Sequence, residues 1–407
     1  MEEFKMLFKN KTTILSKCKL FISSFKPVIF VALVLVTSAI RSQETLNKSV
    51  SPASVGVWLK GDLHVHSRHS TESSNNSISK IINFSKSVKM DYVCITDHDN
   101  HVHGDVEHHT WSDPEFKSDS LLLLYGAEWT TTRGHGNVFS DKPYNHQKLF
   151  DVRDQRDVNI GKVKKSLSIH LSANHPSGKD NFGFSYDLVQ SIEVWNSAVW
   201  PKNANAIMIW DDMLSSGRMM TGRGGSDAHH GVPNGSEKPT SNTYQAEYNY
   251  VGTPTTWVFA KERSLKAVVD ALTQAKVSVS SNPFAPRVEF YADANGDGKF
   301  EMMMGDNIKS NGKPVKFRVQ LNGNLLPDAD YTITVIKNGG KFDTYNLRGS
   351  TPMIEFEDTP NPQGRTYYRV TVEGTNTPYP QVPKSMALSE KMVALSNPIY
   401  FNFNPDF

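Results

Sequence analysis

Short apolar runs alternate with segments of helical periodicity from about residue 58 to residue 280 of this 407-residue chain. Apolar residues recur at helical spacing between the runs, as in Ile78, Ile81 and Ile82 and again over residues 206–214 and 265–272. Alternation of this length favours parallel strands joined by crossover helices, in a barrel or an open sheet. Strands are expected at residues 59–66, 92–98, 121–128, 137–139, 168–175, 192–196, 219–227 and 255–260.

The pattern changes near Asn282, where the helical periodicity stops. Turn signals such as Asn322-Gly323 and Asn338-Gly339 then separate short β-rich runs, a pattern typical of a β-sandwich. We therefore expect an α/β domain over residues 57–284 and an all-β sandwich domain over residues 285–407. The β-rich runs lie at residues 286–291, 315–321, 331–337, 367–372 and 398–403.

The N-terminus combines six lysines within residues 1–26 with an apolar run over residues 28–36. This run is shorter than the roughly 20 residues that a membrane span needs, and it suits the apolar region of a secretory signal. We expect residues 1–43 to be a signal peptide, residues 44–56 to be a linker, and the protein to be secreted or periplasmic in the cell envelope. An uncleaved N-terminal anchor is the alternative, and it would be the protein's only membrane contact.

Net charge bears on the class of partner, and cysteine content bears on disulfide bonds. The whole chain has a net charge of +2, of which residues 1–43 contribute +5, so residues 44–407 carry about −3. This balance gives no electrostatic reason to expect a nucleic-acid partner. Of the two cysteines, Cys18 lies in the signal segment and only Cys94 remains, so disulfides play no part in the mature fold.

Histidine is confined to one region of the chain, because all fourteen histidines lie between His64 and His230. Imidazole binds transition metals and moves protons near neutral pH. His64 and His66 share one face of a strand, since side chains alternate along it. Further polar residues follow other expected strands, and in a (β/α) barrel such strand ends open onto one rim, where catalytic residues lie. These residues, which predict a single metal site, are His98, Glu128, His135, His175, Asp227 and His229.

The order of these motifs resembles the PHP (polymerase and histidinol phosphatase) superfamily, and most closely its carbaryl-hydrolase-like branch of metallo-phosphoesterases. The resemblance covers roughly residues 57–284. It implies a distorted (β/α)7 barrel that holds up to three metal ions, often followed by a C-terminal β-domain. The matching motifs are residues 61–67 (Gly-Asp-Leu-His-Val-His-Ser), 95–98 (Ile-Thr-Asp-His), 126–128 (Gly-Ala-Glu), 134–137 (Gly-His-Gly-Asn), 174–176 (Asn-His-Pro), 192–196 (Ile-Glu-Val-Trp-Asn) and 225–229 (Gly-Ser-Asp-Ala-His).

The resemblance also implies a ligand set. The family usually supplies one more ligand five or six residues after the His-x-His motif, where this chain has Thr71 and Glu72, and only Glu72 is a suitable ligand. Imidazole and carboxylate together suit Zn, Mn or Fe, so we expect two or three such divalent ions. The first metal would take His64, His66, Glu128 and Asp227; Glu128 would bridge to a second metal on His135 and His175; and the third would take His98 and His229.

Other polar residues near these motifs have more than one candidate role. Asp97 precedes His98 and would orient it by hydrogen bonding, or would serve only as a strand-end turn residue. Arg133, Arg223 and Asn196 lie beside the ligand segments, where they would contact an anionic substrate. Ordinary ion pairing is the alternative for the two arginines.

Two histidines and one acidic segment lie outside the expected ligand set. His146 is expected at the surface, and His170 is expected to be structural within a strand. The sequence from Asp293 to Asp297 starts like a calcium loop, but its twelfth position is Met304 and not Glu, so it is not an EF-hand. A plain β-turn is the better interpretation of this segment, with a calcium-stiffened turn as the alternative.

We expect a metal-dependent hydrolase, most readily a phosphoesterase that uses a metal-bridging hydroxide as nucleophile on a small anionic ester, with Glu128 holding the cations at the required spacing. Carbamate or carboxyl-ester cleavage on the same site is one alternative. An amidohydrolase-like barrel is another, but Thr96-Asp97-His98 does not belong to that pattern and no lysine stands at a strand end. A non-catalytic glycan-binding module of the cell envelope is the third, prompted by the β-domain. The sequence defines no oligomeric state.

Overall fold

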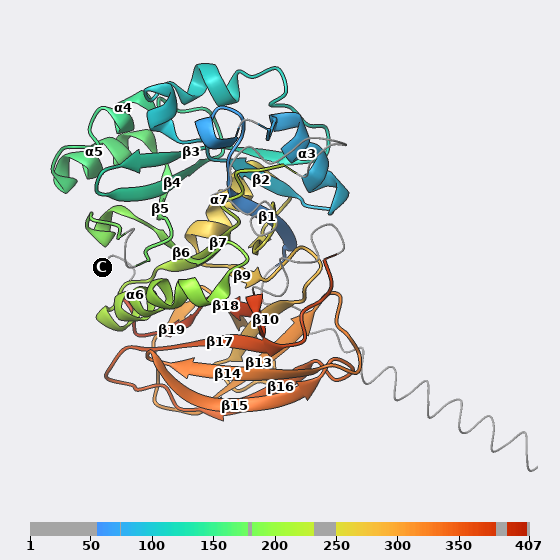
Figure 1. Ribbon diagram of the computed structural model, residues 1–407. Helices are drawn as coiled ribbons and strands as arrows, with labels where there is room; N and C mark the ends of the chain where they lie inside the picture. Colours follow the sequence, from blue (N-terminus) through green and yellow to red (C-terminus); the bar gives the residue numbers. More distant parts are fainter. Residues whose placement is uncertain (1–54, 74, 178–180, 232–249, 380–388, 405–407) are drawn as a thin grey trace, which may run out of the picture. The chain divides into compact units, whose positions relative to one another are not determined.

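The alternating apolar runs fold into a large mixed sheet (Figure 1). The computed structural model describes residues 55–73, 75–177, 181–231, 250–379 and 389–404, so the expected signal peptide lies outside the described residues. Within the described part, residues from 55 onwards belong to one compact unit. No helix there is long and apolar enough to cross a membrane.

The first seven strands form a continuous row in sequence order, β1 to β7. The row curls back on itself, because the residues after β7 bridge to the end of β1 at Val65 and Ala228, and the Asp227 N–H donates to His64 O (2.8 Å). This curl brings the carboxyl ends of distant strands together. The strands are β1 (Val57–Val65), β2 (Tyr92–Ile95), β3 (Leu122–Thr131), β4 (Gly134–Ser140), β5 (His170–Ala173), β6 (Ser191–Asn196) and β7 (Thr221–Gly225).

The strand directions depart from a regular α/β barrel. β1–β2, β2–β3, β5–β6 and β6–β7 pair in parallel, whereas β4 is antiparallel to both β3 and β5. Only Thr132 and Arg133 separate β3 from β4, too few residues for the crossover that parallel strands require. The mixed α/β class is therefore confirmed, but the strands do not alternate regularly with helices.

Among the described residues, five helices and five short helical turns connect the strands. α3 begins after Ser77, whose hydroxyl accepts a hydrogen bond from the Lys80 N–H (3.2 Å), and it buries Ile78, Ile81 and Ile82, the face that the periodicity predicts. The helices are α3 (Ile78–Ser87), α4 (Gln147–Phe150), α5 (Asp157–Leu167), α6 (Ala204–Ser216) and α7 (Leu265–Thr273). The turns are η1 (Thr71–Ser73), η2 (Asp99–Val102), η3 (Glu107–Trp111), η4 (Tyr186–Leu188) and η5 (Trp200–Asn203).

Two sheets pack together in the C-terminal part, seen as two layers at the bottom of Figure 1. Their facing residues alternate with more exposed ones along β13 and β14, and Phe317 of β13 lies against Tyr368 of β17 in the other sheet, with ring centroids 4.5 Å apart. One sheet contains β10 (Arg287–Asp293), β11 (Met302–Met303), β13 (Val315–Asn322) and β16 (Met353–Asp358). The strands β12 (Asn307–Ile308), β14 (Asp330–Lys337), β15 (Gly340–Arg348), β17 (Thr366–Gly374), β18 (Met392–Ser396) and β19 (Ile399–Phe401) belong to the large sheet.

The large sheet runs through both expected domains. β8 (Thr255–Ala260) pairs antiparallel with β1 and with β9 (Val277–Ser280), and β9 pairs with β18. One apolar core contains Trp210 and Val268 together with Tyr367 and Leu395 from the C-terminal strands. The two parts therefore share both a sheet and a core, and the domain boundary near residue 284 stays a prediction.

Candidate metal centre

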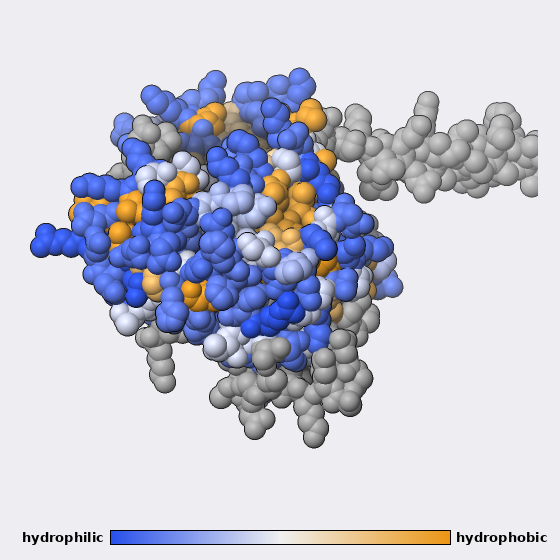
Figure 2. All heavy atoms as spheres, turned by 90° about the horizontal axis from the view of Figure 1, so that it is seen from above, coloured by the Kyte–Doolittle hydropathy of each residue, from blue (hydrophilic) through white to orange (hydrophobic). Residues whose placement is uncertain are grey.

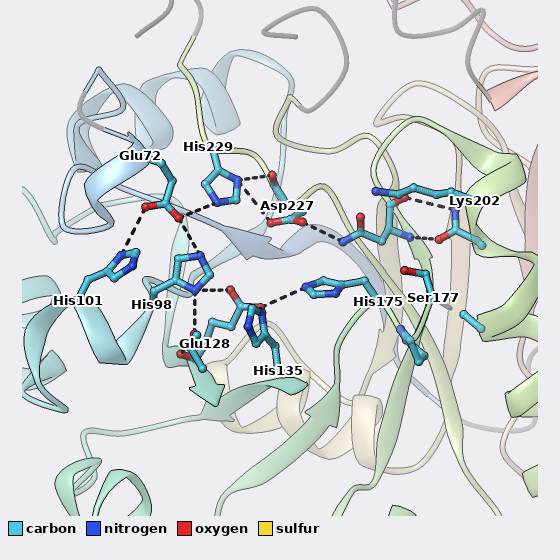
Figure 3. A pocket seen from close by; sticks show the side chains of 15 residues that line it. Glu72, His98, His101, Glu128, His135, His175, Ser177, Lys202, Asp227 and His229 are labelled. Atoms are coloured by element: carbon cyan, nitrogen blue, oxygen red, sulfur yellow. Dashed lines mark hydrogen bonds and ion pairs between the residues drawn. The ribbon is translucent and has the colours of Figure 1, made fainter. Parts of the chain in front are cut away.

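Eight side chains from the strand row converge on one centre, and six of them line a cavity of about 470 Å³ (Figure 3). They come from β1, β3 and β4 and from the segments that follow β1, β2, β5 and β7. The cavity is lined by Glu72, His98, His101, Glu128, Thr130, His135, His175, Pro176, Ser177, Asn196, Lys202, Asn203, Ala206, Asp227 and His229. On the face seen in Figure 2, the described residues are mainly hydrophilic and their apolar side chains gather in small separate groups.

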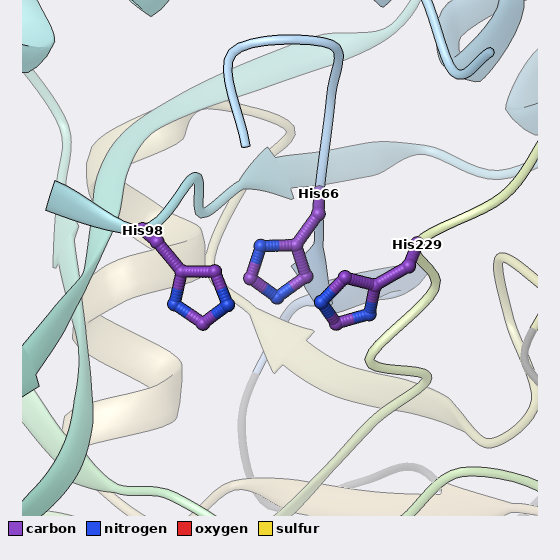
Figure 4. A group of neighbouring side chains, drawn as sticks. All are labelled: His66, His98 and His229. Atoms are coloured by element: carbon purple, nitrogen blue, oxygen red, sulfur yellow. The ribbon is translucent and has the colours of Figure 1, made fainter. Parts of the chain in front are cut away.

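The convergent side chains form overlapping groups whose ligand atoms lie within 4.8 Å of one another. In one group, the ring of His66 lies 4.4 Å from that of His98 and 4.0 Å from that of His229, measured between centroids (Figure 4). All eight ligands expected from the sequence belong to at least one group. The groups are His66, His98 and His229; His64, His66 and Glu128; His64, His175 and Asp227; and His98, Glu128 and His135.

Glu128 lies at the centre of the eight side chains and is wholly buried on β3. Its carboxylate also accepts a hydrogen bond from Asn174 Nδ2 (2.8 Å at Oε1). Oε1 lies 3.2 Å from His135 Nδ1, 3.3 Å from His175 Nε2 and 3.5 Å from His64 Nε2, and Oε2 lies 2.9 Å from His98 Nδ1 and 3.4 Å from His66 Nε2. Both oxygens are therefore surrounded by imidazoles, as a bridging carboxylate would be.

Backbone conformation sets several of these positions. His175 (φ 23°) and Asp227 (φ 55°) have left-handed backbones, which cost free energy and cluster at functional sites. A Cβ at Gly225 would lie 2.5 Å from His64 Cβ and closer still to Glu193 Oε1, so this position on β7 has room only for glycine. The strand ends are therefore packed tightly against the ligand side chains.

The pKa values of the two carboxylates among the eight candidate ligands are lowered, which favours their ionised form. Burial alone would raise the pKa of Glu128, but the positive charges of His98, His64 and His135 hold it well below its usual range. The pKa of Asp227 is likewise held low, with burial opposed first by the charge of His64. Anionic carboxylates are the form that coordinates a cation.

The imidazoles divide between neutral and protonated forms. Burial, reinforced by the charges of His229 and His98, lowers the pKa of His66 well below its usual range, so its ring nitrogens are available as ligands. At His98 burial is outweighed by Glu128, which raises the pKa to about 10. A cation that binds His98 therefore competes with a proton, and binding would release that proton.

The residues present fit divalent cations. Within the described part of the structure, His64 Nε2 and His66 Nε2 are buried and have no hydrogen-bond partner, although Asp227 Oδ1 lies 3.3 Å and 3.2 Å from them. Buried polar atoms rarely lack a partner, and a cation between these nitrogens and the carboxylate would supply one. Imidazole and carboxylate together are the ligands that Zn and related transition metals accept.

Glu72 lies where the additional ligand was expected. Its Oε1 is 3.0 Å from His98 Nε2 and 3.5 Å from His229 Nε2, and its Oε2 is 3.5 Å from His101 Nδ1. The Thr71 hydroxyl donates to the same carboxylate (3.0 Å). His101 thus reaches the cavity from η2. The sequence did not indicate this position, because His101 lies in a polar loop without an apolar strand before it.

A buried layer of polar residues supports the ligands from behind. Glu193 on β6 lies 2.9 Å from His64 Nδ1 and accepts the His175 N–H (3.0 Å). Arg223 donates to Glu193 (2.7 Å) and to Asn174 (2.5 Å), and although burial opposes ionisation, its charge lowers the pKa of Glu193 to about 2. Such carboxylate–imidazole pairs fix the orientation of a ligating ring. Arg223 is wholly buried and does not line the cavity, where a substrate contact was expected.

Asp97 belongs to the same supporting layer on the other side of the centre. It accepts hydrogen bonds from the Ser67 N–H (2.6 Å) and from the hydroxyls of Ser67 (2.7 Å), Ser70 (3.0 Å) and Thr110 (2.7 Å). The Ser70 hydroxyl in turn lies 3.2 Å from His66 Nδ1. Asp97 therefore reaches a candidate ligand through Ser70, and that ligand is His66.

The remaining site expectations have different outcomes. Asn196 lines the cavity, and its Nδ2 lies 3.3 Å from Asp227 Oδ2. Arg133 bonds to Asp157 (2.7 Å) and does not line the cavity. The surface position expected for His146 is wrong: this side chain is buried because its Nε2 pairs with Asp99 Oδ2 (2.9 Å) under the loops that follow β2 and β4.

The acidic turn in the C-terminal part is closed by its own hydrogen bonds. The Asp293 carboxylate accepts the N–H groups of Gly296 (2.7 Å) and Gly298 (2.8 Å), as in a β-turn. One carboxylate oxygen from each of Asp293, Asp297 and Glu301 lies within 4.8 Å of the others. Calcium binding at this turn stays a prediction.

Comparison with known proteins adds a family match for the first part of the site. Residues 62–154 match the PHP domain family, a stretch that contains His64, His66, His98, Glu128 and His135. PHP domains occur in metal-dependent hydrolases, usually phosphoesterases. Together with the clusters of imidazoles and carboxylates, the match supports divalent metal binding.

The other two comparisons give little. No curated protein matches the chain. Among solved structures, one similar to this chain is the CARDB domain of the PF1109 protein from Pyrococcus furiosus in complex with di-metal ions. The alignment covers 29% of this chain and 93% of the CARDB domain, with 12% sequence identity and a TM-score of 0.17.

Proposed function

We propose that this protein is a metal-dependent phosphoesterase, that its curled strand row is a distorted (β/α)7 PHP barrel, and that it belongs to the carbaryl-hydrolase-like branch. The observation that carries the proposal is Glu128, a buried ionised carboxylate within 3.5 Å of five imidazoles beside a polar cavity. A buried anion in such a setting serves to hold cations close together. Two or three ions of Zn, Mn or Fe would bind.

The chain's own residues would hold and position these ions. The bound ions would supply charge neutralisation for the phosphoryl group and an activated water. His64 would be kept in one tautomer and orientation by Glu193, and His66 would be held by the hydrogen-bonded chain through Ser70 to Asp97. Asn196 would present its amide to the substrate beside Asp227.

The ligand assignment proposed from the sequence remains the working one. His64, His66, Glu128 and Asp227 would hold the first ion. The structure supports the proposal of a third ion through Glu72, which lies beside His98 and His229. We also propose that residues 1–43 direct the protein to the periplasm or the exterior, and that the substrate is a small anionic ester.

The test is to measure the metal content of the purified protein and its turnover of aryl phosphomonoesters, phosphodiesters, carboxyl esters and carbamates. The double variant His64→Ala/His66→Ala should lose metal and activity. His108→Ala is the matched control, because His108 is an exposed histidine that pairs only with Asp105 among its described contacts. Absence of turnover across a metal-replete panel would refute the phosphoesterase, and turnover of carbamates alone would favour the carbamate hydrolase on the same site.

A further inference from the structure

The cavity has two walls of different chemistry. The imidazoles and carboxylates of the metal centre form one wall. The second is formed by residues after β5 and β6, namely Pro176, Ser177, Lys202, Asn203 and Ala206. Figure 3 shows Lys202 and Ser177 on the side of the cavity away from His98, His101 and Glu72. Of the described residues that line the cavity, Lys202 is the only lysine or arginine.

The turn that carries Lys202 is held rigidly against the end of β6. The Asn203 side chain accepts the Asn196 N–H (2.8 Å) and donates to the carbonyl groups of Asn196 (3.3 Å), Val199 (3.1 Å) and Trp200 (3.1 Å). The η5 turn is therefore fixed relative to Asn196, which contacts Asp227 of the metal centre. The base of the Lys202 side chain thus has a set position, while its flexible stem is exposed to the cavity mouth.

We propose that Lys202 is the specificity-determining residue that binds an anionic oxygen of the substrate opposite the metal ions. This inference rests on the proposed function. Lysine presents a compact point charge on a flexible stem, which suits phosphate and carboxylate oxygens from several directions. A substrate between Lys202 and the metal centre is held at both ends by positive charge. Esters that carry a negative charge are therefore selected over neutral esters and carbamates.

The test compares wild type, Lys202→Met and Lys202→Arg on three aryl substrates. One is a phosphomonoester, the second is a neutral carboxyl ester, and the third is a carboxyl ester with a carboxylate on its leaving group. Loss of a charge-assisted hydrogen bond at a partly exposed position lowers kcat/KM for anionic substrates by roughly tenfold. Lys202→Arg restores most of the loss, and the neutral ester is unaffected. If Lys202→Met lowers kcat/KM for the phosphomonoester alone, Lys202 binds the scissile phosphoryl group. If it lowers kcat/KM only for the ester with the charged leaving group, Lys202 binds the leaving group.

Equal effects on charged and neutral substrates, or none on any, would overturn the role of Lys202. If wild type turns over none of the three, the proposed phosphoesterase fails separately. The affinity of the manganese-loaded protein for inorganic phosphate, measured by calorimetry, then tests Lys202: Lys202→Met should weaken it roughly tenfold, and unchanged affinity would refute the inference. Lys313→Met, which alters an exposed lysine before β13, is the charge-matched control. Metal content of Lys202→Met should equal that of wild type, because none of the candidate ligands is altered.

Discussion

Replacement of Asp211 by asparagine should destabilise the protein and disturb the cavity that the first turn of the same helix lines. Asp211 on α6 accepts two hydrogen bonds from Arg369 on β17, from Nε (2.8 Å) and from Nη2 (2.5 Å), and one from the Tyr367 hydroxyl (3.0 Å). The side chains of Arg369 and Asp211 are 3% and 15% exposed. This pair therefore fixes α6 to the C-terminal strands through a nearly buried contact.

The expected loss of stability follows from the charge of Arg369, which the substitution leaves without its partner. Removing one partner of a buried ion pair costs about 3–5 kcal/mol, because the other charge stays buried without compensation. Asparagine keeps one oxygen acceptor and Asp211 is partly exposed, so we expect about 3 kcal/mol. The Arg369 Nη1 atom already lacks a hydrogen-bond partner within the described residues, so the guanidinium has no second acceptor to compensate for the loss.

Urea unfolding measures this contribution in Asp211→Asn, in the single variants Asp211→Leu and Arg369→Met, and in the double variant Asp211→Leu/Arg369→Met. A well-packed apolar replacement of both partners is often nearly neutral, so the double variant should be more stable than either single one. The matched control is Asp270→Asn, which breaks the exposed pair with Lys266 and should leave the free energy of unfolding nearly unchanged. Additive destabilisation in the double variant would refute the reasoning.

The same variant should also change catalysis, because Ala206 in the first turn of α6 lines the cavity. A helix that is less firmly held positions this wall less well, so KM should rise. Metal content should stay unchanged, since α6 carries none of the candidate ligands. Loss of metal in Asp211→Asn would show that the helix acts on the metal centre, and an unchanged KM would show that the cavity does not depend on this contact.

Three further predictions concern single positions. Glu193→Gln should weaken metal affinity about 10–100-fold in a chelator competition, because it weakens the contact that orients His64, and unchanged affinity would exclude that role. Gly225→Ala should cost about 1–3 kcal/mol in urea unfolding and lower the metal content by overpacking, whereas Gly340→Ala, where the nearest atom is 3.7 Å away, should leave both unchanged. Burial lowers the pKa of Lys164 from 10.5 to about 8, so the unfolded chain binds more protons and stability rises with pH across that window. Lys164→Met should flatten the rise in urea midpoint between those pH values, and an unaltered rise would contradict the shift.

The ligand positions were readable from the sequence because each one is tied to a strand end. Alternation alone places His64 and His66 on one face at the end of β1, and the apolar runs of β2 and β3 lead into His98 and Glu128, although β2 ends at Ile95 and β3 continues to Thr131. A curled row of strands then brings the strand ends that carry the ligands together, whatever the conformation of the loops. Convergence of the ligands required only the right strand positions, and not the details of the connections.

The direction of β4 was missed because the apolar pattern does not record whether neighbouring strands run in parallel. The information lay in the length of a connection. Residues 137–139 were recognised as a strand, but β4 begins earlier, at Gly134 (φ 123°), directly after the two-residue turn. A connection this short allows only an antiparallel hairpin. His135 therefore reaches the centre from the start of β4, across from Thr130 in the register.

The supporting layer was harder to predict, because its members are recognised only by their partners. Glu193 interrupts the apolar strand β6 and Arg223 lies within the glycine-rich strand β7, and both strands are wholly buried. A buried charge of either sign is costly unless it is paired. β6 and β7 are neighbours in parallel, and their register sets Glu193 directly opposite Arg223. Once this register is known, the two charges must neutralise each other inside the fold, which leaves Arg223 unable to serve the substrate. Among the described residues that line the cavity, the one lysine or arginine is Lys202 on η5, outside the strands, which is why the proposed substrate contact falls on it.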